Sequence, residues 1–171
     1  MGITTTLGSF IITGNKIHVS DPCYNYNCSG AVTLDNALSG RYLATLLKHN
    51  LDIWEIRVSR LTIQHEDYKD IVPDIYSGYE IAVDSGQAGF FDDYYYQHNH
   101  GGDFGDITSL FGLACSLTLS KNHGGILLDK GVVSETGFGD GYYPLFIGKN
   151  NDGKIVAASI SFISDFELEG F

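Results

Sequence analysis

The sequence predicts a mainly β protein: a single antiparallel β domain, either a sandwich or a rolled sheet, with a few short helices and spanning residues 1–171. Three observations support this fold class. Short apolar or alternating runs are separated throughout by Gly, Asn and Asp turns. The chain has 21 Gly but only 3 Pro, which indicates tight turns built on glycine. Its 171 residues, with 43% hydrophobic content, are enough to bury one sizeable core.

The first half of the chain contains four expected strands. Residues 7–13 ("LGSFIIT") and 16–20 ("KIHVS") flank a Gly-Asn turn and predict an opening β-hairpin. Residues 21–30 ("DPCYNYNCSG") predict a loop, because their proline disfavours a regular strand. Residues 40–48 and 52–64 predict the next two strands, the second with an imperfect in-and-out alternation.

The second half predicts further strands and one helix. Residues 79–91 ("YEIAVDSGQAGFF") indicate a strand, a glycine turn and a second strand. Residues 92–99 ("DDYYYQHN") predict a short helix whose first aspartate serves as the N-cap. Residues 107–120 predict a strand and residues 124–135 a hairpin. The clearest hairpin lies over residues 141–163, where two apolar runs meet at "NNDG" and the turn glycine can take a positive φ.

Charge and cysteine content exclude several classes of protein. The net charge is −11, and the ten basic residues form no run, so we expect no binding to nucleic acid polymers. No segment has the length and apolarity of a membrane helix, and the first residues lack the basic start of a signal peptide. The three cysteines, Cys23, Cys28 and Cys115, form an odd set that favours reduced thiols in a cytoplasm. Their spacing does not predict a metal site.

Three short stretches are richer in Asp, Gly and Tyr than folding alone requires. They are "SDPCY" (20–24), "VDSGQAGFFD" (83–92) and "GFGDGYYPLF" (137–146), and each places an aspartate at a strand end beside Gly or Pro. Together they resemble a bacterial and phage family of domains of unknown function, number four-two-four-one, over roughly residues 15–163. The resemblance implies a β-rich domain and no particular reaction. The chain is short for that family, and the cysteines around its first tyrosine motif depart from the family's pattern.

The aspartates of these stretches, Asp21, Asp84 and Asp140, have two interpretations. Each is expected to close a turn by accepting hydrogen bonds from nearby backbone N–H groups. In the alternative, they converge at one rim of a sheet, where carboxylates and an amide hold a polar ligand and a tyrosine ring stacks on it. The residues predicted to bind a ligand in this way are Asp21, Tyr24, Asp84, Gln87, Asp140 and Tyr142.

The histidine pair in "QHNHGGDFGD" suggests a metal site. His98 and His100 would share a side of an extended segment, and Asp103 or Asp106 could complete a facial triad. A metal site needs a complete ligand set, however, and neither a nearby glutamate nor a distant third histidine is identifiable. We therefore expect residues 93–106 to form an exposed loop rich in aromatic residues and glycine, and we predict no metal site.

Three functional hypotheses follow. The leading one is a non-catalytic binding module that sequesters a small polar or aromatic ligand, for example a nucleotide-like one. The second is a hydrolase that uses paired carboxylates, or a metal held by Asp84, His98 and His100. The third is an acidic protein-interaction or inhibitor domain, suggested by the net charge of −11. The expected partner is a small molecule or a protein; the cofactor, if any, and the oligomeric state are unknown.

Overall fold

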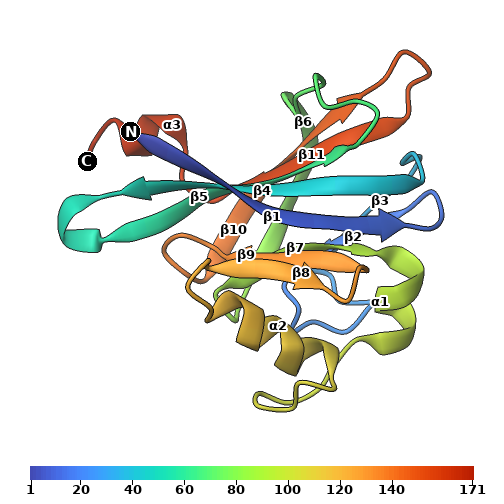
Figure 1. Ribbon diagram of the computed structural model, residues 1–171, viewed down its shortest axis with the longest axis horizontal. Coiled ribbons are helices and arrows are strands. Elements are labelled where there is room, and N and C mark those ends of the chain that lie inside the picture. The colour runs from blue at the N-terminus through green and yellow to red at the C-terminus, as the bar shows by residue number, and fades with distance from the viewer.

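Two antiparallel sheets pack face to face in the computed structural model, which describes all residues 1–171 (Figure 1). The larger sheet contains, in spatial order, β1 (Gly2–Ile12), β4 (Gly40–Asn50), β5 (Ile56–His65), β11 (Ile155–Ser161), β10 (Gly141–Lys149) and β6 (Ile75–Val83). The smaller sheet contains β3 (Val32–Leu34), β2 (Ile17–Ser20), β7 (Gln87–Asp92), β9 (Gly131–Glu135) and β8 (Gly124–Leu127). The fold is a β-sandwich, which is one of the two antiparallel arrangements that the sequence predicted.

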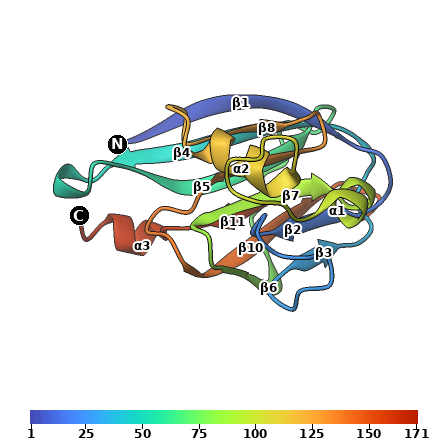
Figure 2. The ribbon, with the colours of Figure 1, turned by 90° about the horizontal axis from the view of Figure 1, so that it is seen from below.

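Four short helices complete the chain: η1 (Asp52–Trp54), α1 (Asp93–Asn99), α2 (Leu110–Thr118) and α3 (Asp165–Leu168). Helices α1 and α2 cover the outer face of the smaller sheet (Figure 2). Helix α3 lies at the end of the molecule that also carries both chain termini (Figure 1). None of these helices is long and apolar enough to cross a membrane.

The main core lies between the two sheets. It contains 26 buried residues, and strand alternation supplies many of them: in β4, for example, Tyr42, Ala44 and Leu46 are buried while the residues between them are only partly so. The Tyr42 hydroxyl donates to the backbone oxygen of Leu38 at 2.6 Å, so its burial leaves no unpaired polar atom. A smaller cluster, which includes Phe91, packs between the smaller sheet and its two covering helices.

Several sequence predictions are confirmed. Strand β4 covers the predicted residues 40–48, and the two late hairpins are β8–β9 and β10–β11. Gly153 in the last hairpin turn has a φ of +77°. Helix α1 begins after Asp92, whose side chain accepts a hydrogen bond from the Tyr95 N–H as an N-cap does.

The predicted opening hairpin is wrong. Strand β1 pairs with β4 in the larger sheet, whereas β2 pairs with β3 and β7 in the smaller one. The Gly-Asn segment is therefore a crossover between sheets. It is held by Asp92, whose Oδ1 accepts hydrogen bonds from the N–H and the hydroxyl of Thr13, each at 2.9 Å.

Two segments that were predicted as strands contain helix instead, one in its main part and the other at its start. Residues 107–120 contain helix α2, and residues 52–64 start with the 3₁₀ turn η1 before β5 begins. In α2 the Ser109 hydroxyl accepts from the Gly112 N–H as an N-cap, and Leu110, Ala114 and Leu117 recur at helical spacing on the side that faces the sheet. The strands predicted over residues 79–91 are correct, but they belong to different sheets.

Candidate functional site

Asp21 lies at the end of β2 and is fully buried. Its Oδ1 accepts from the Cys23 N–H at 2.8 Å and from the Ser85 hydroxyl at 2.6 Å. Its Oδ2 accepts from the N–H groups of Asp84 and Ser85 at 2.8 and 2.7 Å. The carboxylate thus closes its own turn, as predicted, and also fixes the distant turn that carries the chain from the larger sheet to the smaller one.

Asp84 and Asp140 come together at the end of one strand pair. Val83 of β6 and Gly141 of β10 are register partners, so the two aspartates directly beyond them face the same space. They line a hollow of about 350 Å³. This acidic hollow is lined by Tyr24, Ala82, Val83, Asp84, Asp140, Gly141 and Tyr142.

The two tyrosines of the acidic hollow differ. The Tyr24 hydroxyl donates to Asp84 Oδ2 at 2.7 Å, and burial together with this carboxylate raises the pKa of Tyr24 well above its usual range. Tyr142 is 75% exposed, and neither Tyr142 nor Asp140 makes a side-chain hydrogen bond within the chain. A ligand in the hollow would therefore meet one carboxylate held by a phenol, one free carboxylate and one free aromatic ring.

Ser85 and Cys23 lie beside Asp21. The Ser85 hydroxyl is engaged by Asp21. Burial, and then the neighbouring Asp21 carboxylate, raises the pKa of the Cys23 thiol to about 12, so almost no thiolate exists at neutral pH.

Gln87 lies on the other side of the Asp84–Gly86 turn from the acidic hollow. Its side chain is buried; its Nε2 donates to Cys115 Sγ at 3.2 Å, and its Oε1 accepts from the Thr118 hydroxyl at 2.8 Å. It lines a second hollow of about 240 Å³, the apolar hollow, formed by Ser85, Gln87, Phe104, Phe111, Cys115, Thr118 and Leu119. The predicted set of six residues is thus divided by the turn: Asp21 is buried beneath it, and Gln87 is turned towards α2.

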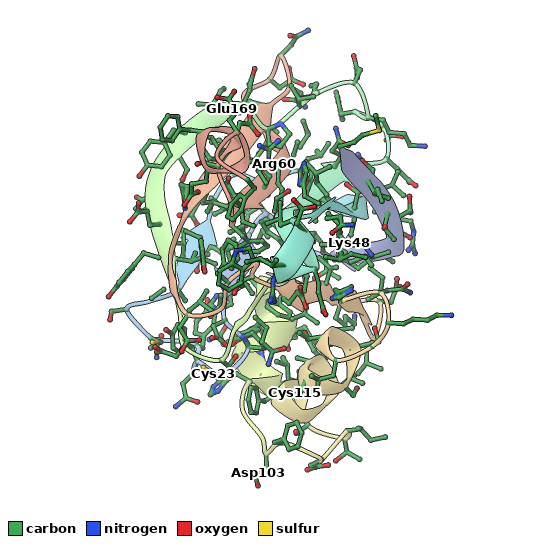
Figure 3. All side chains as sticks on the ribbon, turned by 90° about the vertical axis from the view of Figure 1, so that its left-hand side faces the viewer. Cys23, Lys48, Arg60, Asp103, Cys115 and Glu169 are labelled. Atoms are coloured by element: carbon green, nitrogen blue, oxygen red, sulfur yellow. The ribbon has the colours of Figure 1, made fainter.

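Sequence reasoning missed the apolar hollow because it took residues 107–120 for a strand. The signal that could have found it is the helical spacing of α2, which places Phe111, Cys115 and Leu119 four residues apart on one side. Figure 3 shows Cys23 and Cys115 in the lower part of the molecule, away from Arg60 and Glu169 at the top.

The segment 93–106 is not simply an exposed loop. Tyr96 is fully buried in α1, and its ring stacks on His18 with centroids 4.1 Å apart. His98 contacts the Tyr94 oxygen of its own helix, and His100 Nδ1 lies 3.2 Å from Asn25 Oδ1. No group of three or more His, Cys, Asp or Glu side chains in the chain is arranged to hold a metal ion.

His18 is a buried titratable residue that sequence reasoning did not single out. It is 1% exposed, lies between the rings of Tyr26 and Tyr96, and neither of its ring nitrogens has a hydrogen-bond partner. Burial, and to a smaller extent the charge of His100, lowers the pKa of His18 to about 4, although Asp93 Oδ1 lies 3.9 Å from its Nδ1. At that distance, and with the Asp93 carboxylate already accepting from the Tyr26 hydroxyl, burial outweighs the attraction.

Comparison with protein families identified the family of the chain. The family model described as "Protein of unknown function (DUF4241)" matches residues 27–160, most of the chain. Two of the three stretches rich in Asp, Gly and Tyr, residues 83–92 and 137–146, fall inside this range, whereas Asp21 and its turn precede it. Comparison with curated proteins and with solved structures found no match.

Proposed function

The chain belongs to the DUF4241 family, whose function is unknown, and we propose from its own geometry that it is a non-catalytic binding module for a small polar or aromatic ligand. The observation that carries this proposal is the meeting of Asp84, Asp140 and Tyr142 at one hollow, on a turn that the buried Asp21 fixes. A site held rigid before a ligand arrives loses less entropy on binding.

The charge of the acidic hollow narrows the ligand class. Two carboxylates line it and no Lys, Arg or His does, so hydrogen-bond donors and positively charged groups are favoured there. Tyr142 offers an exposed ring for stacking or a cation–π contact. A nucleotide-like ligand would place its base or sugar in this hollow and keep its phosphates outside.

The protonated Cys23 thiol supports binding without thiol chemistry. Ser85 is engaged by Asp21, and the Cys23 thiol is protonated at neutral pH. Binding of this kind would sequester its ligand. The hydrolase alternative would rest on Asp84 and Asp140 as paired carboxylates, since His98 and His100 form no metal-binding group with Asp84.

We also propose that the protein works in the cytoplasm of a bacterium or a phage-infected cell. Its three cysteines are all free thiols, which suits a reducing compartment. With a net charge of −11, its partners would be small molecules or proteins and neither nucleic acid polymers nor anionic membranes.

The test is a thermal-shift screen with nucleosides, nucleotides, sugars, aromatic amines and divalent metals. A ligand of the folded state raises the melting temperature as its concentration exceeds the dissociation constant. We expect stabilisation by ligands that combine an aromatic ring with donor groups, and a stronger effect from a nucleoside than from its phosphorylated form. Stabilisation by a metal alone would instead support the hydrolase.

Two substitutions locate the binding. Asp140→Asn should abolish most of the ligand-induced shift and leave the free protein as stable as before or slightly more so, because it removes a charge beside Asp84. The control is Asp152→Asn. Asp152 is an exposed aspartate in the β10–β11 turn, away from the hollow, and its substitution should not alter the shift. An equal shift in both variants, or no response to any ligand of the panel, would contradict the proposal.

A further inference from the structure

An aromatic patch lies at the end of the molecule where the chain turns between β4 and β5 (Figure 1). We define it as Ile53, Trp54, Ile56, Phe138 and Phe171. The Trp54 and Phe138 rings meet edge to face with centroids 5.9 Å apart, and Phe171 stacks on Phe138 at the same separation. Ile53 is 87% exposed and Trp54 47%. The three rings form a continuous exposed apolar surface, which is typical of an interaction site.

Arg57 contributes a polar group with an unmet hydrogen bond. Its guanidinium carbon lies 5.8 Å from the centre of the Phe138 ring, a cation–π distance. Its Nε is buried and has no acceptor within the chain. A buried donor without an acceptor destabilises the free protein. Trp and Arg are also the residue types that contribute most to the free energy of protein–protein binding.

The backbone that presents Trp54 is strained. Asp52 has a φ of +53°, and Glu55 has φ 60° and ψ −155°, a region that residues other than glycine rarely occupy. The Leu51 N–H donates to the Glu55 oxygen at 2.9 Å and closes the η1 turn around the tryptophan. The turn therefore keeps an exposed tryptophan in a fixed position at a local energetic cost.

The charges around the patch indicate the chemistry of the partner. Asp52 and Glu55 are exposed on either side of Trp54. Glu167 of α3 is also exposed, and so is Glu169, which directly follows α3 (Figure 3). The nearby positive charges are Arg57 and Arg60, and Arg60 has the Asp165 carboxylate 3.7 Å away. A second copy of the chain would bring like charges together across this surface, and the chain as a whole has a net charge of −11.

We propose that the aromatic patch docks a protein partner that presents apolar or aromatic side chains within a rim of Lys and Arg. Opposite charges across the rim would speed association and favour this partner over others, while Trp54 and Arg57 would supply most of the affinity. The inference goes beyond the ligand-binding function, because Ile53 and Trp54 line neither hollow. Failure of one proposal leaves the other standing.

The test selects binders from a random peptide library displayed on phage, with the full chain as bait. We expect enriched peptides that combine Lys or Arg with Trp, Phe or Leu. Synthetic copies should bind Trp54→Ser at least roughly tenfold more weakly, and affinity for the wild type should fall as salt is added. Glu169→Lys, which leaves the apolar side chains in place, should weaken the same peptides.

The matched control is Ile107→Ser, which removes an exposed apolar side chain from a distant loop; this variant should bind the peptides like the wild type. All variants are first compared with the wild type by urea unfolding. The proposal is overturned by peptides without basic residues, by peptides that bind Trp54→Ser equally well, or by a library that yields no binder. Sedimentation that shows a dimer lost in Trp54→Ser would assign the patch to a second copy instead, and cosedimentation with phosphatidylglycerol vesicles would assign it to a lipid surface.

Discussion

A single carboxylate determines the position of the acidic hollow. Asp21 accepts four hydrogen bonds, and two of their donors, the N–H groups of Asp84 and Ser85, belong to the turn that separates the two hollows. Both oxygens are used, and the side chain is fully buried. Asp21 is thus a positioning residue, whereas Asp84 and Asp140 are exposed and available to a ligand.

We expect Asp21→Asn to destabilise the fold strongly. The new amide nitrogen is a donor, and it would face N–H or hydroxyl donors that now have an acceptor, which leaves buried groups unpaired at about 1–3 kcal/mol each. The free energy of unfolding, measured in urea, should fall by roughly 3 kcal/mol. The exposed Asp140→Asn should change it by less than about 0.5 kcal/mol. Equal effects of the two substitutions would contradict this assignment of Asp21.

At the residue scale, the three Asp-Gly-Tyr stretches in the sequence were sufficient to single out Asp21, Asp84 and Asp140. Aspartate beside Gly or Pro has a local physical meaning, namely acceptance of nearby backbone hydrogen bonds. The position of Gln87 on the far side of the turn from the acidic hollow was not predictable. It depends on hydrogen bonds to Thr118 and Cys115 of a helix that follows much later in the chain.

At the element scale, helix α2 shows why the sequence interpretation was wrong and which residue its packing requires. The apolar run over residues 107–120 suits a buried strand or a buried helix, and composition does not separate the two. The Ser109 cap and the spacing of Leu110, Ala114 and Leu117 favour the helix. Glycine is required at position 112, near the start of the helix, because a side chain there would collide with the backbone oxygens of Asp103 and Asp106.

We therefore expect Gly112→Ala to destabilise the protein, although alanine is the better helix former by about 1 kcal/mol. The collision is with backbone atoms, so the preceding loop or the helix must shift. Urea unfolding should show a net loss of roughly 1–3 kcal/mol. Ser116→Ala on the exposed side of the same helix is the control and should be neutral or slightly stabilising. A more stable Gly112→Ala would mean that the loop is free to move.

At the scale of the whole molecule, the fold class was predictable and much of the strand pairing was not. The hairpins β8–β9 and β10–β11 join neighbouring segments through recognisable turns, so local chemistry is enough to specify them. The pairs β1–β4 and β2–β7 join distant segments, and which strands meet is decided by packing and by contacts such as Thr13 with Asp92. Turn-forming residues between two strands do not determine whether the two strands pair in one sheet or belong to different sheets.

The pH dependence of stability tests the packing between the smaller sheet and α1, where His18 is enclosed by Tyr26, Tyr96 and Asp93. The pKa of His18 is about 4 in the folded protein, against an ordinary value of 6.5. Between these values the unfolded chain binds more protons than the folded one, so stability falls as pH decreases from 6.5 towards 4. The loss attributable to His18 is roughly 3 kcal/mol.

A second effect acts on the whole molecule with the opposite sign. As pH falls towards the sequence pI of about 4.7, the net charge of −11 approaches zero and the repulsion among carboxylates weakens. The wild-type curve alone therefore mixes two effects. His18→Phe keeps an aromatic ring in the stack but cannot titrate, and the difference between the two urea-unfolding curves isolates the histidine. We expect this difference to change by roughly 3 kcal/mol between pH 7 and pH 4, with the wild type losing more. A constant difference would show that the His18 nitrogens are solvated in the folded state, for example by a water molecule that bridges Nδ1 and Asp93.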